Sequence, residues 1–299
     1  MSFYLESRSF GATAIVRGEL TDVDCSEISY QGVDAVEFNY SLGWEGTGFE
    51  RVRKLSGVHS ISLLPSLPIN IAPIHDLENL KNLYVGGEAY GELDLSVFHG
   101  LKQLWGNYHK KLCVTGFENV SSVRVLGGNL REELWANIHK FKNLRRLRAT
   151  LGLMSSIPSL TPLISLHDIS LDRFKNLTNI DAVSELRELR KLSIDSCKKI
   201  YDFSVARKLH NLEWLSMDSC KTIRNIEFIE PLKKLKVLTF NEDSNIETGD
   251  LGAIGKSKQL EYVSFMNRKN YNFRREDFQL TSNFSLQEFG SRLSKEIVD

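Results

Sequence analysis

The residues of this 299-residue chain that could do chemistry together are a cysteine and an aspartate in a nine-residue phrase that occurs twice, which gives two of each. LSIDSCKKI, residues 192–200, returns as LSMDSCKTI, residues 215–223, with seven of nine residues identical. Thiolates and carboxylates are nucleophiles and metal ligands, so such a cluster would be reactive if the fold brought it together. The alternative is that the phrase marks one structural unit, repeated after 23 residues.

The repetition extends well beyond this phrase. The apolar residues of the 23-residue unit that starts at Leu189 recur at every matching offset in the units that start at Leu166 and Leu212. Their common core, LxxLxL, returns with spacings of 19 to 25 residues. The looser copies begin at Val33, Val58, Leu80, Leu101, Val120, Leu144, Leu235 and Leu260. Eleven units therefore cover residues 33–270.

This pattern resembles the leucine-rich-repeat family, whose signature is LxxLxLxxN/CxL. The three most regular units carry it as LHDISLDRF, LRKLSIDSC and LEWLSMDSC. The chain departs from the signature because the next apolar residue follows the cysteine by three positions, and because asparagine is rare at the N/C position. The resemblance implies an α/β solenoid, a leucine-rich-repeat horseshoe with a parallel concave β-sheet and short 3₁₀ or irregular convex segments.

Both ends of such a solenoid need a cover, because terminal repeats would otherwise expose the core. Residues 1–32 alternate polar and apolar side chains, which predicts an N-terminal β-rich cap. Residues 271–299 lose the repeat, and we expect a short helical C-terminal cap there. The predicted domains are thus a cap at 1–32, a solenoid at 33–270 and a second cap at 271–299.

Cys197 and Cys220 occupy the N/C position of the signature, where the side chain points inward, so we expect buried structural thiols. The other two cysteines, Cys25 and Cys113, form no CxxC pair with them. The N-terminus has neither a basic segment nor an apolar stretch typical of a signal peptide. These observations favour a reducing compartment and a cytoplasmic location.

The aspartates follow the predicted strands, where side chains leave the concave face. Asp172, Asp195 and Asp218 would stack at the strand spacing of about 5 Å. Like charges on neighbouring strands destabilise a sheet, and the fold does not need them there. They form either a solvated polar edge or an acidic stripe that meets a basic partner.

Aromatic and arginine side chains dominate binding hot spots, and the predicted concave face carries both. An aromatic zone comes first, an arginine zone follows, and the acidic zone is flanked by two aromatic residues. The predicted partner-binding residues are Tyr84, Trp105, Tyr108, Arg124, Arg146, Arg148, Asp172, Asp195, Trp214, Asp218 and Tyr262. The arginines could also form a phosphate or nucleic-acid patch, although their neighbours are acidic.

Composition excludes several classes of function. Lys+Arg and Asp+Glu both total 38, so the chain lacks the basic excess of a nucleic-acid binder. No window of 18 residues is apolar enough to predict a membrane span. GDLGAIGKS, residues 249–257, has five residues rather than four between the first glycine and GK, so it is no phosphate loop. No catalytic constellation or metal motif is present, and we expect neither an enzyme nor a cofactor.

The sequence therefore predicts a non-enzymatic module that binds a partner protein on its concave face. Its resemblance to free-standing, irregular leucine-rich-repeat proteins suggests an intracellular bacterial immunity, antidote or adaptor protein, for which an acidic stripe would suit a basic partner. The alternatives are the recognition domain of a bacterial effector and a surface or secreted adhesin.

Overall fold

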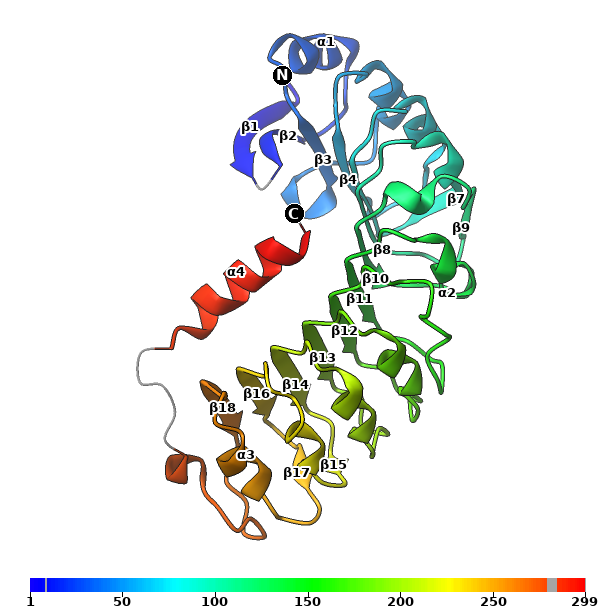
Figure 1. The fold of residues 1–299 in the computed structure, drawn as a ribbon. Helices are drawn as coiled ribbons and strands as arrows, with labels where there is room; N and C mark the ends of the chain where they lie inside the picture. Colours follow the sequence, from blue (N-terminus) through cyan, green and yellow to red (C-terminus); the bar gives the residue numbers. More distant parts are fainter. Residues whose placement is uncertain (9, 279–283, 299) are drawn as a thin grey trace. The chain divides into compact units, whose positions relative to one another are not determined.

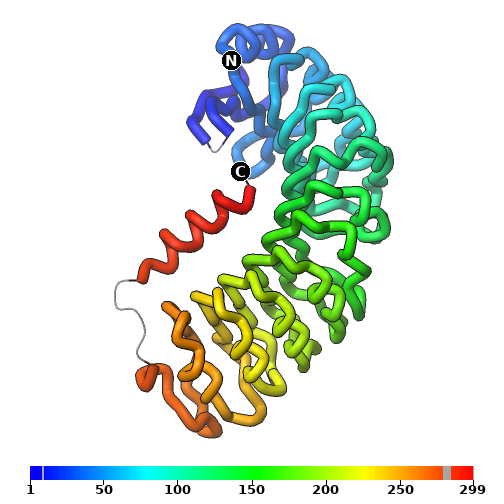
Figure 2. The backbone as a smooth tube through the Cα atoms, in the orientation of Figure 1, coloured from blue at the N-terminus to red at the C-terminus, as the bar shows by residue number. Residues whose placement is uncertain are grey.

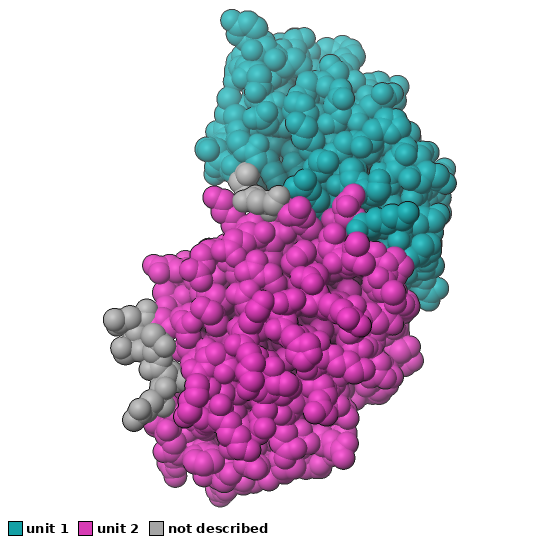
Figure 3. All heavy atoms as spheres, in the orientation of Figure 1, with its two compact units in different colours: residues 1–142 teal, residues 143–299 magenta. Residues whose placement is uncertain are grey.

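The computed structural model describes residues 1–8, 10–278 and 284–298 (Figure 1). Successive turns of the backbone lie side by side (Figure 2). The chain divides into two compact units, Met1–Lys142 (unit 1) and Asn143–Asp299 (unit 2), shown in Figure 3. Parts of the two predicted caps, residue 9 and residues 279–283 and 299, lie outside the described residues.

Unit 1 contains seven strands of one sheet (Figure 1). In sheet order they are β1 (Phe3–Arg8), β2 (Gly11–Val16), β3 (Ala35–Asn39), β4 (Ser60–Leu64), β6 (Asn82–Val85), β8 (Gln103–Asn107) and β10 (Val125–Asn129). The first pair is antiparallel and the later pairs are parallel. A parallel series with one strand per repeat is the arrangement that the LxxLxL spacing predicts.

Unit 2 contains six strands of the large sheet, and neighbouring strands among these six pair in parallel. In sheet order they are β11 (Arg146–Thr150), β12 (Asp168–Asp172), β13 (Lys191–Asp195), β14 (Trp214–Asp218), β16 (Val237–Phe240) and β18 (Tyr262–Phe265). The three repeats in strict sequence register are β12, β13 and β14, and their strands pair residue for residue.

Short segments return the chain from one strand to the next. They are the 3₁₀ helices η1 (Tyr40–Leu42), η2 (Phe49–Lys54), η3 (Ala72–Asp76), η4 (Leu95–Val97), η5 (Val120–Ser122), η6 (Ile138–Lys140), η7 (Asp181–Glu185), η8 (Ser204–Lys208), η9 (Glu227–Ile229) and η10 (Arg275–Asp277), and the α-helices α1 (Asp22–Tyr30), α2 (Glu132–Ala136), α3 (Gly252–Lys256) and α4 (Leu286–Val298). Two small sheets join them: β5 (Ile69–Asn70), β7 (Ala89–Asp94) and β9 (Leu112–Thr115); and β15 (Thr222–Ile223) with β17 (Asn245–Ile246).

The core of each unit lies behind the strands and is built from the signature residues. In the repeat of β13, Leu192 and Ile194 are fully buried, because alternate strand residues point to one face. Phe174 and Phe203 of the return segments are fully buried too. No single repeat could bury these side chains alone, so stacking supplies the main stabilisation. The other side of the sheet, which faces away from this core, is called the strand face below.

One repeat was predicted in the wrong register. The unit expected to begin at Val120 begins at Val123, because β10 starts at Val125 and this residue pairs with Gln103. Val120, Val123 and Leu126 are spaced by three, so the LxxLxL pattern fits in two ways. Tertiary pairing selects the second, and Val120 lies in η5.

The residues predicted to form the N-terminal cap hold the β1–β2 hairpin and then a helix, α1. Thr21 and Asp24 form a capping box: the Asp24 amide donates to Thr21 Oγ1 (3.2 Å), and the Thr21 amide donates to Asp24 Oδ2 (3.0 Å). The apolar pattern predicted strand here because α1 buries only Asp24, Cys25 and Ile28 and so shows little helical periodicity.

The C-terminal residues divide into two parts. Tyr271 packs edge-on against Phe240 and Phe265, and Phe278 also contacts Phe265, so residues 271–278 cover the last repeats. Helix α4 instead packs on the strand face of unit 2. Among the described helices, none combines the length and the apolar character needed to cross a bilayer.

Candidate binding surfaces

Side chains that leave the strand face form two rows in register. The first row comes from the first residue of each strand, and the second row comes from the third residue. In unit 1 the first row is Ala35, Ser60, Asn82, Gln103 and Val125, and the second is Glu37, Ser62, Tyr84, Trp105 and Gly127. In unit 2 the first row is Arg146, Asp168, Lys191, Trp214, Val237 and Tyr262.

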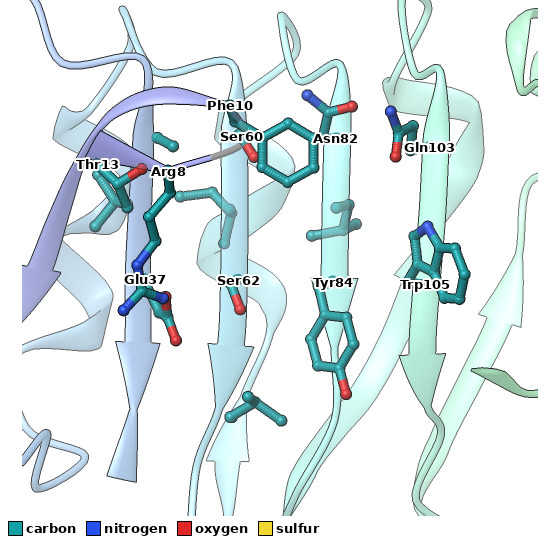
Figure 4. Close-up of a pocket in the computed structure, with 15 residues that line it drawn as sticks. Arg8, Phe10, Thr13, Glu37, Ser60, Ser62, Asn82, Tyr84, Gln103 and Trp105 are labelled. Atoms are coloured by element: carbon teal, nitrogen blue, oxygen red, sulfur yellow. The ribbon is translucent and has the colours of Figure 1, made fainter. Parts of the chain in front are cut away.

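The second row of unit 1 places the two predicted aromatic residues beside each other. Tyr84 pairs in register with Trp105, and both side chains are half-buried (Figure 4). A Cβ atom at Gly127, on the next strand, would clash with the six-membered ring of Trp105. The absence of a side chain at Gly127 therefore lets the indole lie against β10. The predicted register would have paired Arg124 with Trp105, but the repeat begins three residues later, so Gly127 takes this position.

Arg8, the last residue of β1, and Phe10, just before β2, form a wall beside this aromatic floor (Figure 4). Arg8 forms an ion pair with Glu37 of the floor, and its Nη2 lies 2.7 Å from Glu6 Oε2. Asn39 Nδ2 donates to Glu37 Oε1 (2.9 Å). Phe10 is 43% exposed and lines the same cleft, whose volume is about 390 Å³. We call this cleft the hairpin groove.

The hairpin groove offers both apolar and hydrogen-bonding surface. The side-chain amides of Asn82 and Gln103 lie on its floor and make no hydrogen bond to any described residue. Burial raises the pKa of Tyr84, so its phenol stays protonated at neutral pH. Amides and a neutral phenol both donate and accept, which suits the alternating N–H and C=O groups of a polypeptide.

Two predicted site residues lie elsewhere than expected. Tyr108 was predicted to point outward, but it is 5% exposed and contacts the backbone at Gly106; β8 ends at Asn107, so the chain has already turned back into the core. Arg124 precedes β10, and its amide donates to Lys102 O (2.8 Å). Arg124 therefore does not take the outward-facing strand position that was predicted for it, because the register of its repeat differs by three residues.

The acidic stripe is in register, as predicted. Asp172 pairs with Asp195, which pairs with Asp218. Asp172 is neutralised by Arg173, whose Nη2 lies 2.7 Å from its Oδ2. Asp195 is exposed and accepts a hydrogen bond from Ser196 Oγ (2.9 Å). Local partners therefore reduce the repulsion between neighbouring carboxylates, and Asp195 is the most open of the three.

Asp218 is bound into the sheet. Its Oδ2 accepts from Ser216 Oγ and from Thr239 Oγ1 (2.9 Å). Its Oδ1 accepts from the amide (2.7 Å) and from Nδ2 (3.1 Å) of Asn241. Four hydrogen bonds fill most of the acceptor sites of one carboxylate. Asp218 therefore links β14 to β16 and has little capacity left to bind a partner protein.

Trp214 and Tyr262, the aromatic residues predicted to flank the stripe, lie under helix α4. The Trp214 ring stacks on Phe289 with centroids 6.2 Å apart and planes 9° apart. Phe289, Leu293 and Val237 form a buried cluster, against which Trp214 and Tyr262 pack. In this conformation both are partly covered by the chain's own helix.

The β11 arginines also lie beside α4. Arg146 Nε donates to Asp168 Oδ2 (2.8 Å), and its Nη2 donates to the carbonyl (2.9 Å) and hydroxyl (2.6 Å) oxygens of Ser294. Arg148 Nη2 is 3.8 Å from the same Asp168 oxygen. The two arginines therefore share one carboxylate that is 1% exposed.

The repeated cysteines are structural. Cys197 Sγ donates to Asp195 O (3.3 Å), and Cys220 Sγ donates to Asp218 O (3.2 Å), so each thiol closes the turn after its strand. Burial raises the pKa of Cys197 to about 11 and raises that of Cys220 further. No three potential metal ligands among His, Cys, Asp and Glu come together in the described part of the chain.

We expect thiol reagents at pH 8 to modify Cys113 in the folded protein and to reach the other cysteines only after unfolding, because Cys113 is exposed and Cys25, Cys197 and Cys220 are buried. Since burial raises the folded pKa of Cys197 from 9.0 to about 11, its stabilising contribution is present below pH 9 and lost as the pH rises to 11. Mass spectrometry of labelled peptides, and urea unfolding across this pH range beside Cys197→Ala, test both statements. Fast native labelling of Cys197 would contradict them.

No protein-family model matches the chain, and no curated protein matches it. Solved structures do. An internalin of Listeria monocytogenes, InlF, is 18% identical over 85% of this chain and 74% of its own, with a TM-score of 0.59. The leucine-rich-repeat domain of the type III effector XopL is 16% identical over 70% of this chain and 77% of its own, with a TM-score of 0.51. The chain therefore has the leucine-rich-repeat fold, and the predicted fold class is confirmed.

Proposed function

We propose that the protein is a binding module that holds an extended segment of a partner protein in the hairpin groove of unit 1. The observation that carries the proposal is the pair Tyr84 and Trp105, side by side on the floor of a walled cleft. Partly exposed aromatic side chains in a pocket are the usual anchors of protein interfaces, because they bury much area at little entropic cost.

The polar groups of the groove favour a polypeptide over a small ionic substrate. Arg8 and Glu37 neutralise each other, so the groove offers no unpaired charge from these two residues. The side-chain amides of Asn82 and Gln103, which bond to no described residue, can bond a polypeptide backbone, and Trp105 and Phe10 provide apolar contact on two sides. An extended segment with an aromatic or aliphatic side chain matches this combination.

Finer assignments are part of the same proposal. Four free thiols support a reducing, cytoplasmic location, and the shared fold with an effector's repeat domain is compatible with a recognition role. Within this class we favour an intracellular bacterial immunity or adaptor protein over an effector domain or an adhesin. A basic surface of the partner would meet Asp195, the open member of the acidic stripe.

Site-specific photo-crosslinking tests the proposal. A photo-reactive amino acid at Ser62, on the groove floor, is expected to capture one protein in cells of the source organism. The same amino acid at Tyr30, which is 87% exposed at the end of α1, serves as the matched control and should not capture it. Capture of the same proteins from both positions, or of none from Ser62, would count against the groove.

A further inference from the structure

Helix α4 occupies a seat on the strand face of unit 2. Phe289, Leu293 and Ile297 recur every four residues along one side of the helix and are buried. The seat consists of Trp214 and Val237 with Tyr262 beside them. This is the geometry in which an amphipathic helix binds a groove through anchors at successive turns.

Two polar links connect the C-terminal half of α4 to Arg146 of β11 and to Arg190, the residue before β13. Arg146 donates to Ser294, and Arg190 Nη2 lies 2.7 Å from Glu296 Oε2. Within the part of the chain that the structure describes, no ion pair or side-chain hydrogen bond joins the N-terminal half of the helix to the sheet. Gln287 and Ser291, one turn apart, face a cleft of about 520 Å³ between the helix and the sheet.

The sheet side of that cleft is cationic. Arg148 and Lys191 line it together with Trp214. Arg148 Nε is buried and has no hydrogen-bond partner in the part of the chain that the structure describes. The Lys191 ammonium lies 4.1 Å from the centre of the Trp214 ring, and no described carboxylate lies within ion-pair distance of it. Asp168, whose charge favours the protonated form of Lys191, already lies 2.8 Å from Arg146 Nε and 3.8 Å from Arg148 Nη2.

This arrangement is electrostatically incomplete. Burial lowers the pKa of both Lys191 and Arg148, which means that their charged forms are destabilised where they stand. Three cations, Arg146, Arg148 and Lys191, have one carboxylate, Asp168, among them. Helix α4 offers glutamine and serine, and no carboxylate, at the two positions that face Arg148 and Lys191. The seat therefore matches the apolar side of α4, but α4 supplies no negative charge opposite Arg148 and Lys191.

We propose that the strand face of unit 2 binds an acidic amphipathic helix of another protein, and that α4 holds this seat until such a helix displaces it. The incoming helix would keep an aromatic residue and two aliphatic residues at the positions of Phe289, Leu293 and Ile297. It would carry carboxylates at the positions of Gln287 and Ser291, facing Lys191 and Arg148. This inference does not depend on the hairpin groove, because the two surfaces share no residue.

The test uses the full-length protein and two fluorescent peptides. One peptide has the sequence of residues 284–298, and the other carries Q287E and S291E. Leu293→Glu places a charge in the buried cluster and is expected to release α4. The released variant should then bind the acidic peptide about tenfold more tightly than the unmodified peptide, as measured by anisotropy at low salt. The wild type should bind both more weakly, because its own α4 competes.

Charge substitutions supply the controls. K191Q and R148Q in the released variant should abolish the preference for the acidic peptide, whereas Lys295→Glu, on the exposed side of α4, should leave it unchanged. If Leu293→Glu does not fold by circular dichroism, Phe289→Ala replaces it. Equal affinity for the two peptides would overturn the proposal and indicate a seat made for α4 itself or for α4 of a second copy. Absence of peptide binding to a folded, released variant would overturn it as well.

Discussion

Replacing Trp105 by alanine is expected to weaken binding of the partner by about 30-fold, or about 2 kcal/mol, the typical loss at an aromatic hot spot. The indole lies between Tyr84 and the strand at Gly127, so its removal eliminates one side of the apolar floor. Its side chain is only half-buried in the free protein, so the loss in binding should exceed the loss in stability. Calorimetry or surface plasmon resonance with the partner identified by crosslinking measures the change.

The control for this variant is Tyr40→Ala. Tyr40 is also an aromatic residue of unit 1 and is 55% exposed, but it does not line the hairpin groove. Its replacement should leave affinity unchanged. If Trp105→Ala and Tyr40→Ala had equal effects, or if Trp105→Ala had none, the groove would not be the binding surface.

The largest loss of stability is expected from Phe240→Ala, which should lower the free energy of unfolding by roughly 3–5 kcal/mol. Phe240 is fully buried and stacks on Phe265 with ring centroids 4.7 Å apart, while Tyr271 packs against its edge. Alanine would leave a cavity that these neighbours cannot fill without breaking the stack of the last repeats. Urea denaturation followed by circular dichroism measures the change.

Met266→Ala provides the comparison, because Met266 directly follows Phe265 at the end of β18 but is 56% exposed. It should change the free energy of unfolding by less than about 1 kcal/mol. Since each repeat contacts mainly its neighbours, hydrogen exchange in the Phe240 variant should rise first around β16 and β18. A uniform rise across unit 2 would show that its repeats unfold as one cooperative block.

The two surfaces differ in how they are made. The hairpin groove is open, and its side-chain amides bond to none of the residues that the structure describes, so a partner can enter without a conformational change. The seat of α4 is filled, so a partner must compete with an attached helix for it. Competition of this kind lowers the apparent affinity by the fraction of molecules in which the seat is free.

The sequence determined the repeat and most of its strands. The alternation in LxL sets which side chains enter the core, and stacking at a constant repeat length brings equivalent positions into register. The pairing of Tyr84 with Trp105 and the row of Asp172, Asp195 and Asp218 both follow from this local rule. The inward position of Cys197 and Cys220 does too, because their place in each unit is the same.

The local rule failed where two patterns overlapped or where a strand ended. Val120, Val123 and Leu126 allow two registers, and only pairing with Gln103 selects one. Tyr108 lies beyond the end of its strand, so counting offsets no longer predicted its direction.

Only the tertiary structure decided which parts of the strand face are open. Arg8 and Phe10 belong to a hairpin outside the repeats, and their approach to Tyr84 depends on how that hairpin pairs with β3. Arg146 and Ser294 are 148 residues apart, and no periodicity relates them. The spacing of Phe289, Leu293 and Ile297 indicates an apolar helix side in need of a partner, but hydrophobic attraction has no direction, so pattern alone does not say where the helix lies. The seat is decided by the shape and charge of the folded sheet.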